Sequence, residues 1–236
     1  MGNLVVDSLT LSLGKKDQKK EILHGLSLIL PLNKISVLVG ESGSGKTTLL
    51  RAILGLTSYE GTISLDGINL LGIPTKNRNF SYVNQDIALY PHLTLFQNIA
   101  FPLKGSFAKG EEIRRRVFDS ASSLGIEDCL ARRPNQVSLG QCQRASLAKA
   151  LVKKSELYLL DEPFANVDEA NRYPMLLDIK RVFQKEGASV IYVTHSLREA
   201  YLMGEHFAVM EKGRIALSGG QKEFTSYVDS LGVDVR

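Results

Sequence analysis

The residue types best suited to chemistry lie in a stretch rich in glycine and serine, residues 40–48, which reads GESGSGKTT. It matches the pattern G-x-x-x-x-G-K-[ST] in full, in which successive backbone N–H groups surround a phosphate. Lys46 is predicted to reach the β- and γ-phosphates, and the Thr47 hydroxyl to bind Mg²⁺. The pattern therefore predicts a site for a nucleoside triphosphate such as ATP. The predicted contacts are Gly40, Glu41, Ser42, Gly43, Ser44, Gly45, Lys46, Thr47 and Thr48.

A second group of candidate residues follows four apolar residues in LYLLDEP, residues 157–163. Asp161 and Glu162 are predicted to lie at the carboxyl end of a buried strand, where α/β sheets bind ligands. We expect Asp161 to orient the water shell of Mg²⁺ and Glu162 to act as general base toward a water. Acidic residues often close strands without a catalytic role, but here a complete phosphate loop precedes them. Together the two motifs predict nucleotide hydrolysis.

The elements that must position these residues alternate between strand and helix. Residues 34–40 form a continuous apolar run typical of a parallel sheet, and the phosphate loop joins it to a helix over about 46–55. Alternating patterns predict further strands. From about Phe96 to Lys154 helical periodicity dominates, and Pro174 predicts a kink or a late start in a later helix. The predicted strands lie at 4–14, 21–30, 61–67, 79–85, 157–162 and 188–195, with a hairpin at 207–219.

These patterns predict an α/β fold built on a P-loop NTPase core. Its sheet is expected to be mixed and mostly parallel, with an N-terminal antiparallel β-subdomain and an inserted α-helical subdomain. We expect one domain over residues 1–236, with the core at about 1–88 and 156–236 and the helical insertion at about 89–155. No regulatory domain is expected after the core.

The composition excludes several classes of protein. Of the 236 residues, 44% are hydrophobic, yet no apolar run approaches the ~20 residues of a membrane span. The start resembles neither a signal peptide nor a myristoylation site. The two cysteines lack metal-type spacing, which favours a reducing, cytosolic setting. The net charge of +4 is scattered: KKDQKK at 15–20 is predicted to be a solvated hairpin tip, and we expect no nucleic-acid partner.

The order of the motifs resembles the ATP-binding subunit of ABC transporters over essentially the whole chain. In that family two ATPase domains enclose two ATP molecules head to tail, so the signature turn of one subunit contacts the nucleotide of the other. The resemblance implies that VSLGQCQR, residues 137–144, is the signature turn and that Gln85 senses Mg²⁺ and the attacking water. It also implies that Asp168 couples the two sites and that His195 contacts the γ-phosphate. The implied signature contacts are Ser138, Gly140 and Gln141.

Two departures from the family pattern bear on activity. Leu139 replaces the first signature glycine, which leaves a working contact, a degraded one or a simple helix start as alternatives. We favour a working site, because Leu is tolerated if the backbone φ is negative there. Leu13 stands where the family usually stacks an aromatic side chain on adenine, so we expect weak base discrimination and modest ATP affinity.

The segment 85–104, QDIALYPHLTLFQNIAFPLK, closely resembles importer ATPases. The resemblance implies a groove near Gln85–Phe96 for a coupling helix of transmembrane permease subunits, with an extracytoplasmic solute-binding protein as an indirect partner. It implies a peripheral location on the cytoplasmic face of the cell membrane and a homo- or heterodimer of ATPase subunits. An exporter-type subunit, or a soluble ABC ATPase acting on nucleic acid or ribosomes, remains the alternative.

Overall fold

The computed structural model describes residues 2–14, 19–104 and 110–235. At its centre is a six-stranded sheet in the order β10-β9-β3-β8-β7-β6, in which the neighbours from β9 to β6 pair in parallel and β10 pairs antiparallel with β9. This mixed, mostly parallel sheet confirms the predicted fold class. Its strands are β3 (Ile35–Val39), β6 (Phe80–Val83), β7 (Leu157–Asp161), β8 (Val190–Thr194), β9 (His206–Glu211) and β10 (Arg214–Gly219).

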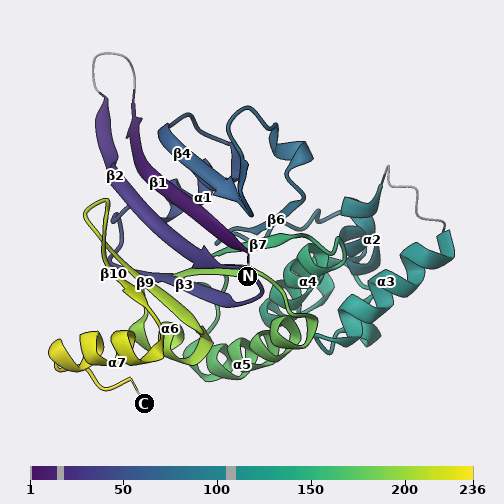
Figure 1. The fold of residues 1–236 in the computed structure, drawn as a ribbon. Helices are drawn as coiled ribbons and strands as arrows, with labels where there is room; N and C mark the ends of the chain where they lie inside the picture. The colour runs from purple at the N-terminus through teal and green to yellow at the C-terminus, as the bar shows by residue number, and fades with distance from the viewer. Residues whose placement is uncertain (1, 15–18, 105–109, 236) are drawn as a thin grey trace.

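A second, antiparallel sheet lies beside the first, in the order β2-β1-β4-β5. The long strands β1 and β2 cross above β3 and β9, with α1 between the two sheets and β4 on the far side of β1 (Figure 1). The predicted lysine-rich tip falls largely outside the described residues. These strands are β1 (Asn3–Leu13), β2 (Lys20–Pro31), β4 (Glu60–Leu65) and β5 (Ile68–Asn69).

Helices cover the other side of the central sheet and extend from its β6 edge (Figure 1). Between β6 and β7 the chain forms α2 (Leu95–Ala100), α3 (Gly110–Ser122) and α4 (Leu139–Leu151). The helices α5 (Glu169–Glu186), α6 (Leu197–Met203) and α7 (Gln221–Ser230) follow later in the chain, and α1 (Lys46–Leu54) follows β3. The late start proposed for α5 is wrong, because the helix begins at Glu169 and Pro174 lies inside it.

The two cores explain why β3 reads as a continuous apolar run. Because successive side chains point to opposite faces of a strand, Val37 and Val39 join the core that α5, α6 and α7 cover. Leu38 joins the second core, between the central sheet, α1 and the antiparallel sheet. Burial on both faces leaves β3 rigid, so it holds the loop that follows it at a fixed position.

Candidate functional site

The phosphate loop joins β3 to α1 and is shaped by its glycines. Gly43 and Gly45 have φ of 80° and 104°, a left-handed conformation that favours glycine. The Lys46 ammonium folds back over the loop, because Nζ donates to the carbonyl oxygens of Gly40 at 2.7 Å and Glu41 at 2.8 Å. The loop is therefore closed around its own lysine.

A cavity of about 510 Å³ lies over this loop. Residues 40–44 form its floor, and His195 from the end of β8, the turn after β9 and Tyr227 of α7 complete its wall. The Ser44 hydroxyl is buried and has no hydrogen-bond partner among the described residues. An unpartnered buried hydroxyl in a glycine-rich loop suits a ligand rich in acceptor oxygens, such as a phosphate.

Asp161 lies next to the start of α1, at the carboxyl end of β7. Its Oδ1 accepts a hydrogen bond from the Thr47 hydroxyl at 3.1 Å, and its Oδ2 accepts one from the Tyr82 hydroxyl at 3.1 Å. Only 5% of Asp161 is exposed, and this burial raises the pKa of the carboxyl. Burial likewise lowers the pKa of the Lys46 ammonium, while the charges of Glu162 and Asp161 oppose that shift.

The Thr47 hydroxyl and the Asp161 carboxylate together form a set of oxygen donors that fits Mg²⁺. Mg²⁺ is usually held by one or two carboxylates and the phosphates of its substrate rather than by an all-protein cage. The described residues contain no group of three or more His, Cys, Asp or Glu that could hold a metal ion. A metal here would depend on phosphate oxygens for the rest of its ligands.

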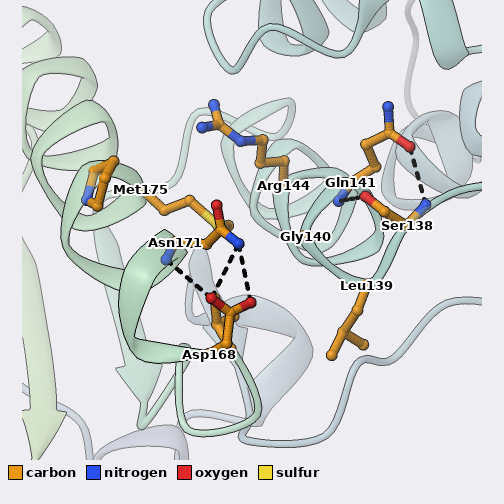
Figure 2. A pocket seen from close by; sticks show the side chains of 10 residues that line it. Ser138, Leu139, Gly140, Gln141, Arg144, Asp168, Asn171 and Met175 are labelled. Carbon is orange, nitrogen blue, oxygen red and sulfur yellow. Dashed lines mark hydrogen bonds between the residues drawn. The ribbon is translucent and has the colours of Figure 1, made fainter.

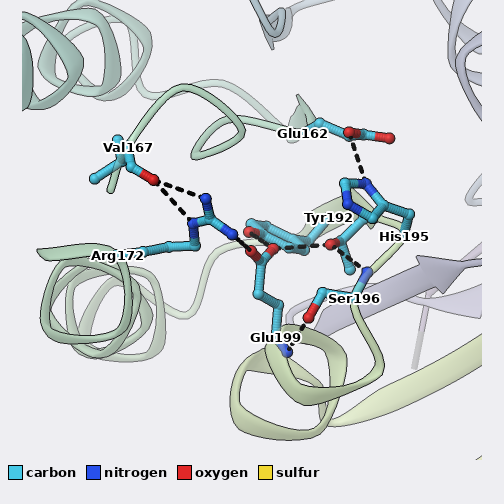
Figure 3. Close-up of polar contacts among 8 residues, drawn as sticks. Glu162, Val167, Arg172, Tyr192, His195, Ser196 and Glu199 are labelled. Atoms are coloured by element: carbon cyan, nitrogen blue, oxygen red, sulfur yellow. Dashed lines mark hydrogen bonds and ion pairs between the residues drawn. The ribbon is translucent and has the colours of Figure 1, made fainter. Parts of the chain in front are cut away.

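Glu162 and His195 meet above the ends of two adjacent parallel strands. Asp161 pairs with Val193 in the register of β7 and β8, so the residues that follow both strands project from the same edge of the sheet. His195 Nδ1 lies 2.9 Å from Glu162 Oε2 (Figure 3). Glu162 has φ of 47°, an uncommon conformation for a residue with a Cβ. Such strained residues cluster at active sites.

A buried polar network supports the His195 turn from below. Glu199 of α6 accepts hydrogen bonds from the hydroxyls of Tyr192 at 2.9 Å and Thr194 at 2.8 Å. The Arg172 guanidinium of α5 lies 3.6 Å from the other Glu199 oxygen and donates to the Val167 carbonyl at 2.7 Å (Figure 3). The network therefore connects the turn that precedes α5 with the turn that carries His195.

A separate pocket of about 340 Å³ gathers the predicted signature residues (Figure 2). Ser138 caps α4: its hydroxyl accepts from Gln141 N at 3.2 Å, and Gln141 Oε1 accepts from Ser138 N at 3.0 Å. Asp168 caps α5 and accepts hydrogen bonds from Asn171, which hold the pKa of Asp168 below its usual range. Gly140 also lines this pocket, which shares no lining residue with the cavity over the phosphate loop.

Leu139 occupies the first position of α4, and its φ is not positive. The backbone therefore accepts leucine without strain, as expected. Its side chain is 54% exposed and extends away from the Ser138–Gln141 pair (Figure 2). Among the described residues, packing does not require glycine at position 140 either, because an added Cβ would meet only Met175 Sδ at 3.8 Å and Ser138 Oγ at 4.0 Å.

Two predicted site residues are not brought to the loop. Leu13 ends β1 opposite Lys20, is 44% exposed and does not line the cavity over the loop. Gln85 is exposed and its carbonyl accepts from Asn166 Nδ2 at 3.3 Å, so the structure connects its backbone, and not its side chain, to the turn after Glu162. Their predicted contacts with base and metal remain predictions.

The segment predicted to face a permease forms a rigid aromatic surface. Tyr90 is 38% exposed and its ring lies 4.7 Å from that of Phe101, with the Lys149 ammonium 4.8 Å above Tyr90. The buried Asn98 side chain holds this loop, since it accepts from Tyr90 N at 2.6 Å and donates to the carbonyls of Leu93 and Thr94. Pro91 and His92 are exposed.

Sequence reasoning missed Tyr82, Asn98, Arg172 and Glu199. Glu199 carried a detectable signal, because it lies four residues before Met203 on the buried face of α6. A charged residue on an apolar helical face requires a buried partner. Tyr82 carried none, because its partner depends on the register of β6 against β7.

Comparison with known proteins agrees with this geometry. A family model described as ABC transporter matches residues 23–165. The chain is 41% identical to the molybdate/tungstate import ATP-binding protein WtpC of Pyrococcus horikoshii, over 89% of this chain and 61% of that protein. It is 39% identical to the sn-glycerol-3-phosphate import ATP-binding protein UgpC of Brucella abortus, over 93% and 62%. The chain therefore belongs to the ABC transporter family, and it spans about three fifths of the length of these curated relatives.

Solved structures share the fold. CbiO1 from Clostridium perfringens, described as part of the ABC transporter complex cbiONQ, superposes with a TM-score of 0.86 at 24% identity, covering 97% of this chain and 92% of that one. The ATP-binding cassette MJ0796, solved as a dimer bound to ADP and Pi, gives 0.81 at 26% identity, covering 92% and 98%. Across the described residues, no helix combines the length and apolar character that crossing a membrane requires.

Proposed function

We propose that this chain is an ATP-hydrolysing subunit that dimerises around two ATP molecules and drives solute import through separate membrane subunits. The observation that carries the proposal is the phosphate loop together with two contacts beside it. Thr47 donates to Asp161, and Glu162 contacts His195, which lines the cavity over the loop. Relatives named as import ATP-binding proteins support the direction of transport. An exporter-type subunit is the alternative, and no feature of the site favours it.

The reaction follows from the groups in place. The loop amides and the Lys46 ammonium bind the β- and γ-phosphates, and Lys46 exchanges the carbonyls of Gly40 and Glu41 for phosphate oxygens. Thr47 and Asp161 would hold Mg²⁺, which would neutralise part of the negative charge of the phosphates. Glu162 accepts the proton of the attacking water, and His195 orients the Glu162 carboxylate through the 2.9 Å contact. Gln85 is assigned to the same water.

The second pocket is proposed to complete the site of the opposing subunit. Because Ser138 only accepts in the capping pair, its own proton remains available to donate to a phosphate oxygen. The N-terminus of the 13-residue helix α4 adds partial positive charge there. The packing of the described residues does not require glycine at position 140, and Gly140 would permit close approach of a nucleotide. Asp168 and Gln141 lie in the same pocket and would contact the opposing subunit.

The partners and location follow from the same proposal. The surface formed by Tyr90, Phe101 and Lys149 would receive a coupling helix of the permease subunits. The chain would thus act as a peripheral subunit on the cytoplasmic face of the membrane, with a solute-binding protein contributing indirectly. Leu13 would contact adenine without aromatic stacking.

The decisive experiment is the solution mass of Glu162→Gln with and without Mg-ATP. Blocking proton transfer while keeping the fold should trap the closed dimer, so we expect ATP-dependent dimerisation that EDTA abolishes. Glu162→Gln carrying Lys46→Ala is the matched control and should stay monomeric. Nucleotide binding without any change in mass would contradict the homodimer and indicate an unlike partner subunit.

A further inference from the structure

Tyr82 lies on the same face of the central sheet as the Asp161 carboxylate. Tyr82 pairs with Leu159 in the parallel register of β6 and β7, and Asp161 lies two residues beyond Leu159. Residues two apart share a face of a strand, and Leu159 and Tyr82 pack in the core that α1 covers. The Tyr82 hydroxyl therefore reaches Asp161 at the end of β7, beside the start of α1, where Thr47 lies.

The Asp161 carboxylate has one hydroxyl donor on each oxygen. Thr47 donates to Oδ1 at 3.1 Å and Tyr82 donates to Oδ2 at 3.1 Å. A carboxylate offers about four lone-pair positions, so the two bonds leave acceptor capacity for metal-bound water. Thr47 can bind a metal through an oxygen lone pair while its hydroxyl still donates to Asp161. Tyr82 lies on the neighbouring strand β6, and its hydroxyl contributes only a hydrogen bond to Asp161.

The Tyr82 hydroxyl donates to a carboxylate that is almost fully buried, since Asp161 is only 5% exposed. Hydrogen bonds to an ionised partner are stronger than neutral ones and fix geometry more firmly.

We propose that Tyr82 is a positioning residue for the metal: its hydroxyl fixes Asp161 Oδ2 and thereby sets the affinity of the nucleotide site for Mg²⁺. The inference rests on the proposed function and extends it to Tyr82, which acts through its hydrogen bond to Asp161. Groups that orient a metal ligand commonly change metal affinity by 10- to 100-fold when they are removed. We expect a change in Mg²⁺ affinity at the lower end of this range, because Thr47 still donates to Asp161 Oδ1.

The test is the Mg²⁺ dependence of ADP binding to Tyr82→Phe, measured by calorimetry without turnover. We expect ADP affinity in EDTA to stay within about twofold of the wild type. The Mg²⁺ concentration that half-maximally restores tight binding should rise by roughly tenfold. Tyr82→Met, which also lacks the donor, should give the same shift. Tyr158→Phe on β7, whose hydroxyl accepts from Ser155 N, controls for the loss of a buried tyrosine oxygen and should leave the Mg²⁺ dependence unchanged.

Each outcome separates the inference from the proposed function. If the Mg²⁺ requirement of either folded Tyr82 variant is unshifted, the inference is wrong. It is also wrong if a variant loses as much ADP affinity in EDTA as it loses with Mg²⁺, because that result would indicate a structural role. If the wild type binds ADP equally well with and without Mg²⁺, the proposed metal-dependent site fails instead. Thermal melting of each variant establishes that it is folded before binding is measured.

Discussion

His195 Nδ1 lies 2.9 Å from Glu162 Oε2, above the ends of two adjacent parallel strands. When Nδ1 carries the proton in this hydrogen bond, Nε2 is the nitrogen left to face a ligand, because the partner of one ring nitrogen sets the role of the other. Because His195 lines the cavity over the phosphate loop, the same contact connects Glu162 to that cavity. We predict that the two side chains act as one functional unit.

We predict that Glu162→Gln lowers the rate of phosphate release at least about a hundredfold, because it removes the general base. His195→Ala should lower it less, and the double variant should be no slower than Glu162→Gln alone, since residues that act as a unit are non-additive. Steady-state phosphate release at saturating ATP measures all three. Multiplied losses in the double variant would show that the two residues act independently.

The capping role of Ser138 can be separated from its phosphate contact. Ser138→Asp should keep the cap and stability, whereas Ser138→Ala should lose about 1 kcal/mol of the free energy of unfolding. In the Glu162→Gln background, the Asp variant should nevertheless abolish ATP-dependent dimerisation, because its carboxylate would face a phosphate. Urea denaturation and solution mass measure the two effects. Dimerisation of the Asp variant at wild-type ATP concentrations would exclude Ser138 as a phosphate contact.

Leu139→Gly should change the ATPase rate less than about twofold. Leu139 has a helical backbone and an exposed side chain, so the substitution relieves no strain. It should cost roughly 0.5–1 kcal/mol of stability, because glycine loses more conformational freedom on folding. A several-fold increase in rate would mean that the leucine restrains the signature turn.

Glu199→Gln should destabilise the fold by on the order of 3 kcal/mol, because it leaves the partly buried Arg172 guanidinium without its charge partner. Glu112→Gln removes an exposed partner of Arg116 on α3 and should cost less than about 1 kcal/mol. Denaturant unfolding compares the two. Equal and small effects would show that the Glu199 network contributes little beyond packing.

Stability should also fall below neutral pH because of His206. Burial, reinforced by the nearby Lys34 charge, lowers the pKa of His206 below its usual value of 6.5. As the pH falls, the unfolded chain therefore binds a proton at His206 before the folded chain does. The free energy of unfolding keeps its full value above about pH 6.5 and declines as the pH falls below it. His206→Asn should reduce the fall in Tm between pH 7.5 and 5.5 by roughly 1–3 °C. His92→Asn, at an exposed loop position, should not.

Local sequence patterns predicted the fold because the sequence of each strand indicates which of its faces are buried. The residues of β3, β7 and β8 are all buried, and all three strands read as continuous apolar runs. Helix α7 escaped prediction although Phe224 and Val228 have helical spacing, because the stretch between them is polar. Phe224 stacks on Phe207, with ring centroids 4.2 Å apart, which is a tertiary contact.

The sequence predicted those parts of the site that one continuous segment forms. It did not predict contacts between residues of two segments that are distant in the sequence. The phosphate loop takes its shape from its own glycines. The contact of Tyr82 with Asp161, and that of Glu199 with Arg172, depend on register and helix packing. Alternation along one strand does not state which residue of the neighbouring strand lies beside it.

The phosphate-loop cavity and the signature pocket share no lining residue, so damage to each can be assigned to different copies of the chain. In a mixed form of the proposed head-to-tail dimer, a copy with Lys46→Ala keeps an intact signature turn, and a copy with Ser138→Asp keeps an intact loop. One composite site would then contain both defects, and the other would contain both intact halves. Two inactive proteins should therefore complement each other on mixing, and recover up to half of the sites that the mixed dimers contain.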